Sequence, residues 1–112
     1  MIKSRCFRND KYLKFIRQQN CIIDGHNHNI HAHHVRVDFF GAGIKPSDYR
    51  TIPLTAMRHN ELHNIGEKAF FRKYKISHNH LIMAYMNLFL LNHGEIENKH
   101  LEKIEDVIEQ LR

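Results

Sequence analysis

The sequence predicts an α+β fold whose core is a β-hairpin followed by a helix, with an N-terminal helix before it and C-terminal helices after it. Two β-prone runs, NCIID and NIHAHHVRV, are separated by an interval in which Gly25, Asn27 and Asn29 tolerate the dihedral angles of a reversal. Apolar residues recur at helical spacing on both sides of these runs. With 112 residues, 42% of them hydrophobic, the chain has enough apolar material for one modest core. We therefore expect a single domain over residues 1–112.

A short helix is expected over KYLKFIRQQ, with Asp10 as its N-cap and basic residues on its solvent side. Its apolar side consists of Tyr12, Leu13, Phe15 and Ile16. After the hairpin, the stretch FFGAGIKPSDYRTIP is expected to be a loop, because Gly41, Gly43 and Pro46 interrupt regular structure.

The next helix is expected from about Ala56 to Lys73, with Thr55 as its cap. Asn64 and Gly66 interrupt its apolar stripe, so a break there is expected. These elements give a core over about residues 12–74.

A C-terminal helical extension is expected over about residues 77–112. Ser77 is the predicted N-cap of a helix over HNHLIMAYMNLFLLN, which is apolar around most of its circumference and should be buried. A last amphipathic helix should pack over it, with acidic residues on its other side. Its apolar side consists of Ile96, Leu101, Ile104, Val107, Ile108 and Leu111.

The charge balance favours a polyanionic partner, because the formal net charge is +5 and the isoelectric point is near 9.4. Nucleic acid is the first partner to consider. Cys6 and Cys21 lack the spacing of a disulfide framework, which indicates a reduced protein of the cytoplasm. No membrane partner is expected, because the most apolar stretch, Leu81–Leu91, falls short of the ~20 residues needed to cross a bilayer.

The best-defined chemical signal is the pair His59 and His63 in the run RHNELH. Residues four apart on a helix emerge one above the other, so both imidazoles can reach one ion. The metalloprotease motif HExxH is excluded, because Glu61 lies two residues from His59 and points to another side of the helix.

His33 and His34 are neighbours at the end of the second β-prone run, so they point to opposite faces unless the strand ends or bends there. His31 shares a face with His33 and could replace it as a ligand. The remaining histidines are expected in turns or on the surface, namely His26, His28, His78, His80, His93 and His100. Three imidazoles binding a cation and a fourth acting as base would suit phosphodiester hydrolysis.

In this combination the sequence resembles the HNH nuclease superfamily, also called ββα-metal or His-Me finger, and especially its phage and prophage branch, which includes the recombination enhancement function nuclease Ref. The resemblance runs from about Tyr12 to Tyr74. It rests on CIID, then IHAHHVR, then GAGIKPSDYRTIPLT, then RHNELHNIGEKAFFRKY, in the order of the family's hairpin, loop and metal-binding helix.

The resemblance implies a metal-dependent endonuclease that hydrolyses DNA phosphodiester bonds. It implies that His34 is the general base, that His33, His59 and His63 surround the metal, and that Asp48 or Thr51 orients the base. One divalent cation is expected, with Mg²⁺ as the working ion, although imidazole donors also favour Mn²⁺, Zn²⁺ or Ni²⁺. The residues expected to contact DNA phosphates, with weak sequence preference, are Arg36, Arg50, Arg72 and Lys73.

The sequence departs from the family where relatives often hold a second, structural zinc. The corresponding positions here are Cys21, Asp24, Thr55 and Arg58, which cannot reproduce a tetrahedral zinc site. We therefore expect no structural zinc, and a hydrogen-bonded Asp24–Arg58 pair in its place.

Two other functions stay open at the level of sequence. The chain could be a catalytically weak or inactive DNA-binding accessory protein that retains the HNH fold, or its histidine-rich hairpin could sense or store metal. The sequence also leaves open the oligomeric state and whether a recombination protein positions the domain on DNA.

Overall fold

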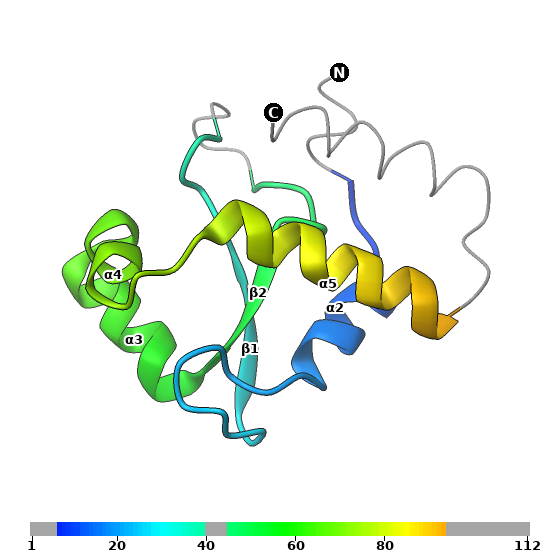
Figure 1. Cartoon of the computed structure of the whole chain (residues 1–112), viewed down its shortest axis with the longest axis horizontal. Helices are drawn as coiled ribbons and strands as arrows, with labels where there is room; N and C mark the ends of the chain where they lie inside the picture. Colours follow the sequence, from blue (N-terminus) through cyan, green and yellow to red (C-terminus); the bar gives the residue numbers. More distant parts are fainter. Residues whose placement is uncertain (1–6, 40–44, 94–112) are drawn as a thin grey trace.

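The structure is a computed structural model that describes residues 7–39 and 45–93. It has the predicted α+β class (Figure 1). The elements in order are α2 (Asp10–Arg17), β1 (Ile30–His34), β2 (Thr51–Thr55), α3 (Ala56–Ile65), α4 (Glu67–Lys73) and α5 (His78–His93). The last predicted helix, over residues 96–111, lies outside the described residues.

The sheet has two antiparallel strands, and its register runs from Ile30 opposite Thr55 to His34 opposite Thr51. The predicted partner of β1 was wrong. The run NCIID does not form a strand, because the N–H of Gly25 turns back to donate to the carbonyl of Cys21 at 2.9 Å. The true partner is TIPLT, which was assigned to a loop and helix start.

Pro53 explains why β2 was missed, since a proline inside a short run argues against a strand. Here it is tolerated at an edge, because β2 pairs through its other side with β1 and the ring costs no ladder hydrogen bond. The carbonyl of Pro53 accepts from the N–H of Ile22 at 3.3 Å, which ties the turn after Cys21 to the outer side of β2.

Helix α2 begins one residue earlier than predicted. Asn9, rather than Asp10, is the N-cap, and its side-chain oxygen accepts from the N–H of Tyr12 at 3.1 Å. Asp10 instead lies in the first turn, where its negative charge is favourable beside the helix N-terminus.

The boundaries of the later helices follow the sequence closely. Thr55 is the N-cap of α3 and accepts from the N–H of Arg58, as predicted. The predicted break falls at Gly66, whose φ of 95° is open to glycine and strained for other residues. Helix α5 begins directly after Ser77, whose hydroxyl lies 2.6 Å from Nδ1 of His80.

Helix α5 runs in front of the sheet, with α3 and α4 at one end of the molecule and α2 toward the other (Figure 1). Its buried side includes Ile82, Met86 and Phe89, and the Phe89 ring lies edge-on to Tyr12 with centroids 5.0 Å apart. The prediction that this helix, apolar around most of its circumference, is buried holds for one face only, because Leu91 is 81% exposed and Met83 is 38% exposed. One face of α5 thus supplies the core contacts.

In the part of the chain that the structure describes, no helix combines the length and the apolar character required to span a membrane.

Candidate metal centre

Three histidines converge between β1 and α3. One ring nitrogen each from His33, His59 and His63 lies within 4.8 Å of the other two. Nε2 of His59 is 3.1 Å from Nδ1 of His33 and 3.1 Å from Nε2 of His63. Nitrogens bound to one tetrahedral zinc are separated by about 3.3 Å, given Zn–N bonds of about 2.0–2.1 Å. The described residues therefore include a three-nitrogen group with nearly the spacing of metal ligands.

The chain path fixes this group. Thr55 ends β2 and also caps α3, so no loop separates the sheet from the helix. The β1–β2 ladder places His33 opposite Ile52, three residues before that junction. Because strand and helix are joined rigidly, the imidazoles on the first two turns of α3 face β1.

His59 is held in the neutral form that a metal ligand needs. Burial, and after it the neighbouring charges of His33, His63 and His31, together lower its pKa to about 4. At neutral pH the ring therefore keeps a lone pair for a cation.

Glu67, at the start of α4, orients His33. Its Oε2 lies 2.6 Å from Nε2 of His33, and its carboxylate also accepts from the backbone N–H groups of Arg36 and Val37. Burial alone would raise the Glu67 pKa, but the bonds from His33 and the two N–H groups hold it below its usual value. The carboxylate thus accepts the Nε2 proton of His33 and leaves Nδ1 free to bind an ion.

Sequence reasoning missed Glu67. Its position directly after the predicted break at Gly66 placed an acid at a helix start, but nothing in the sequence showed that this acid reaches His33. Glu61 behaves as expected, since it bonds Lys73 and Tyr74 rather than the histidine group.

His31 contacts the group without joining it. Its Nδ1 lies 2.9 Å from Nδ1 of His59, on the side of the ring away from His33 and His63. The alternative in which His31 replaces His33 as a ligand is therefore not the arrangement seen.

His34 lies on the other face of β1, where Nε2 is 2.8 Å from Oδ1 of Asp48. Asp48 is buried and also accepts from the N–H of Asn9 at 2.7 Å. Burial raises its pKa, but the bonds from His34 and Asn9 outweigh this effect and keep the pKa low. Thr51 contributes indirectly, because its hydroxyl donates to the backbone carbonyl of Asp48 at 2.8 Å.

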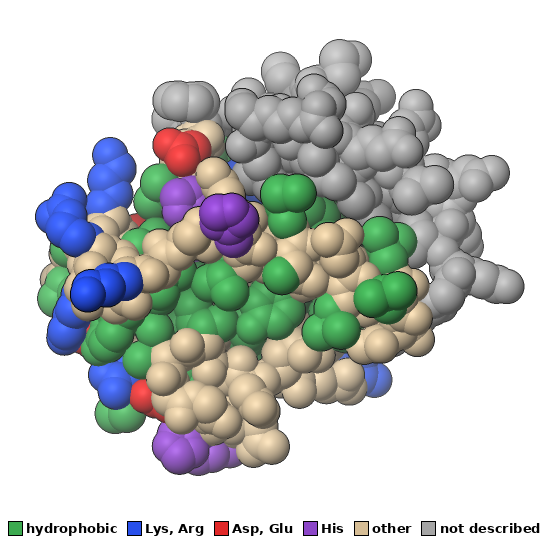
Figure 2. All heavy atoms as spheres, viewed as in Figure 1, with side chains coloured by type: hydrophobic (Ala, Val, Ile, Leu, Met, Phe, Trp, Pro, Cys, Tyr) green, Lys and Arg blue, Asp and Glu red, His purple; other side chains and the backbone are tan. Residues whose placement is uncertain are grey.

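The predicted phosphate contacts divide into two kinds. Arg50 was wrongly predicted as a phosphate ligand, because it is 1% exposed and its guanidinium donates to the carbonyls of Val35 and Val37. Arg36, Arg72 and Lys73 are exposed, although Lys73 also pairs with Glu61 at 2.5 Å. Figure 2 shows Lys and Arg side chains gathered at the end of the molecule formed by α3 and α4.

Two adjoining hollows lie beside the histidine group. The first, of about 240 Å³, is lined by His33, Arg36, Leu62, His63, Gly66 and Glu67. The second, of about 510 Å³, shares Arg36, Gly66 and Glu67 with the first and adds Lys68 and Arg72 to its lining. A basic surface thus continues from the candidate metal centre along α4.

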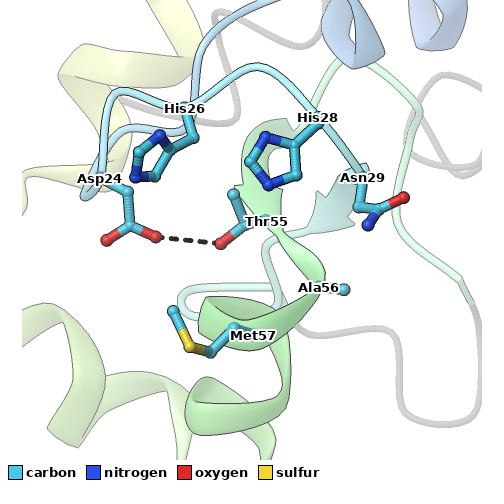
Figure 3. Close-up of a pocket in the computed structure, with 7 residues that line it drawn as sticks. All are labelled: Asp24, His26, His28, Asn29, Thr55, Ala56 and Met57. Atoms are coloured by element: carbon cyan, nitrogen blue, oxygen red, sulfur yellow. Dashed lines mark hydrogen bonds between the residues drawn. The ribbon is translucent and has the colours of Figure 1, made fainter.

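Asp24 and Arg58 form the hydrogen-bonded pair expected in place of a structural zinc. Nε of Arg58 donates to Oδ1 of Asp24 at 2.8 Å. The Thr55 hydroxyl donates to Oδ2 of Asp24 at 3.1 Å (Figure 3). The bond from Arg58 is the main reason why the pKa of Asp24 lies below its usual value. His26 and His28 lie on the exposed loop near Asp24 and Thr55, in the turn where the sequence predicted them (Figure 3).

Comparison with curated proteins and with solved structures finds no match for the chain. A family model does match it over residues 2–90, which is most of its length. The chain therefore belongs to the DUF968 family, which is described as a family of proteins of unknown function.

Proposed function

We propose that this protein is a metal-dependent endonuclease that hydrolyses DNA phosphodiester bonds, in the manner implied by its resemblance to HNH nucleases. The observation that carries the proposal is the convergence of His33, His59 and His63 between β1 and α3, together with the part-buried His34–Asp48 pair on the other face of β1. The first group has the chemistry of a cation site, and the second has that of an oriented base.

The three imidazoles would hold the cation, which supplies charge stabilisation at a phosphate oxygen and at the departing oxygen. His34 would take a proton from the attacking water. Because Asp48 accepts a proton held on Nε2, the lone pair of the neutral His34 ring is on Nδ1, which makes no hydrogen bond within the described residues. Asp48 would also stabilise the imidazolium that forms when Nδ1 is protonated.

The donor set bears on the choice of ion. Mg²⁺ prefers oxygen ligands, whereas three imidazoles suit Zn²⁺, Ni²⁺ or a related transition ion. We therefore propose a transition ion as the tightest-binding cation, and keep Mg²⁺, the ion expected from the sequence, as a comparison in the activity assay.

The basic surface favours DNA as the polyanion. Arg36, Lys68 and Arg72 line the larger hollow beside the histidine group, and the chain carries a formal charge of +5. Binding through such contacts should weaken steeply with salt and show little sequence preference. The proposal places the protein in the cytoplasm, where the free thiol of Cys21 would stay reduced.

Plasmid nicking by metal-free protein, after addition of Mg²⁺, Mn²⁺, Ni²⁺ or Zn²⁺, tests the proposal. We expect nicking by the wild type in at least one ion. His34→Ala should lose about 10²–10⁴ in rate while still binding the ion, as expected for loss of a general base. His63→Ala should lose both ion and activity, and His28→Ala, an exposed histidine outside both groups, should match the wild type.

Equal nicking by wild type and His34→Ala would remove the base assignment. A wild type that binds ion and DNA but cleaves in none of the four ions would contradict the enzyme, and would favour the DNA-binding accessory protein.

A further inference from the structure

His59 is the central ring of four. Its Nε2 faces His33 and His63, and its Nδ1 faces Nδ1 of His31 at 2.9 Å. The His31 and His59 rings lie edge to face, with centroids 5.1 Å apart and planes at 88°. His59 is thus the ring in this group whose two nitrogens both lie within hydrogen-bonding distance of other imidazoles.

A neutral imidazole carries one N–H and one lone pair. If the proton of His59 is on Nδ1, the ring donates to His31 and its Nε2 lone pair points at His33 and His63. If the proton is on Nε2, that nitrogen cannot bind an ion. The group that accepts a hydrogen bond from Nδ1 of His59 therefore decides which of the two tautomers is favoured. In metal-bound histidines generally, the hydrogen bond made by the nitrogen that does not bind the metal has this effect.

The fold holds His31 where this effect requires it. His31 and His33 are two residues apart on β1 and share one face, so the strand contacts the His59 ring from two sides. His33 is turned by its own outer bond to Glu67 at 2.6 Å. His31 lies outside the three-nitrogen group, so its contact is with His59 and not with the proposed ion.

We propose that His31 is a positioning residue of the metal centre: its Nδ1 accepts the Nδ1–H of His59 and so directs Nε2 of His59 toward the cation. This inference rests on the metal centre of the proposed function. It does not depend on DNA cleavage, because its test measures ion binding and the protonation of one ring.

The test compares the wild type with His31→Asn and His31→Ala, all stripped of metal. The asparagine oxygen can take the place of the imidazole Nδ1 as acceptor, whereas alanine offers none. His28→Ala is the matched control, since it removes an exposed histidine from the preceding loop. Two measurements are made: Co²⁺ titration followed by its visible spectrum with Zn²⁺ competition, and the ¹⁵N shifts of the metal-free imidazoles.

We expect one ion per chain in every variant. His31→Ala should bind it about 10–100-fold more weakly, the usual loss when an outer partner of a metal-bound histidine is removed. His31→Asn should recover most of the affinity, and His28→Ala should show no loss. In the metal-free wild type His59 should carry its proton on Nδ1, and in His31→Ala the two forms should mix.

Equal affinity of wild type and His31→Ala would overturn the proposal, as would an asparagine variant as weak as the alanine variant. A second ion in the wild type that disappears in His31→Ala would also overturn it, because His31 would then be a ligand. A wild type that binds no ion would contradict both the positioning role of His31 and the proposed metal centre. Ion binding without any nicking would count against the nuclease alone.

Discussion

Replacing Arg58 by alanine should destabilise the protein without involving any metal. Arg58 joins the turn that carries Asp24 to the first turn of α3, and it also contacts Glu61 and Tyr74. Glu61 keeps bonds from Lys73 and Tyr74 when the guanidinium is removed. Asp24 then keeps the bond from the Thr55 hydroxyl but loses its charged partner, so the main loss falls on the Asp24 carboxylate.

The size of the effect follows from burial. The Asp24 side chain is 9% exposed and that of Arg58 is 28% exposed, so the bond between them is only partly screened by water. A hydrogen bond to a charged group contributes about 1.5–3 kcal/mol when lost in such a setting. For a domain of this size each kcal/mol lowers the melting temperature by about 4–8 °C, so we expect a fall of roughly 6–24 °C.

Thermal and urea unfolding, with a chelator present throughout, measure this loss free of any ion at the histidine group. Arg72→Ala, which removes an exposed arginine from α4, is the matched control and should change stability little. Combining Arg58→Ala with Asp24→Asn should cost less than the sum of the two single changes, because the partners interact directly.

Two results would refute this reasoning. The first is an Arg58→Ala protein that melts within about a degree of the Arg72→Ala control, where a loss of about 1.5 kcal/mol or more is expected. The second is tightly held zinc in the purified wild type beyond the ion bound by the histidine group. That zinc would mean that metal, rather than the Asp24–Arg58 pair, joins the turn to the helix.

Three further predictions concern single side chains. Glu67→Gln keeps an acceptor for the backbone N–H groups but weakens orientation of His33, so Co²⁺ affinity should fall about 10-fold or more, and unchanged affinity would contradict the role given to Glu67. Arg50→Ala should lower the free energy of unfolding in urea by about 3–5 kcal/mol, because it leaves a cavity and removes the donors to the carbonyls of Val35 and Val37. Normal stability with weakened DNA binding would instead support the predicted phosphate contact. The folded pKa of Asp48 lies below its unfolded value of 3.8, so its stabilisation is complete above about pH 4 and is lost as pH falls below it. In Asp48→Asn the free energy of unfolding should fall less steeply below about pH 4 than in the wild type. Equal pH dependence of this free energy in the two proteins would contradict the stabilising role given to Asp48.

The sequence alone determined the features that depend on neighbours along the chain. The spacing of His59 and His63 puts both rings on one side of α3 whatever the helix packs against, and Thr55 and Gly66 mark the ends of α3 through their own capping and dihedral preferences. The Asp24–Arg58 pair joins segments that are far apart in sequence, and it was predicted from the resemblance to a zinc-binding pattern rather than from local preferences.

Tertiary structure decided which groups meet across the chain. The partner of β1, the burial of Arg50, and the bonds of His33 to Glu67 and of His59 to His31 all join segments that are far apart in sequence. Local propensity carries no information about such pairings, because strand register and burial depend on everything that packs around a residue. Pro53 argued against a strand at β2, because a proline removes a hydrogen-bond donor from the sheet. It is tolerated only because the outer side of β2 pairs with no other strand among the described residues.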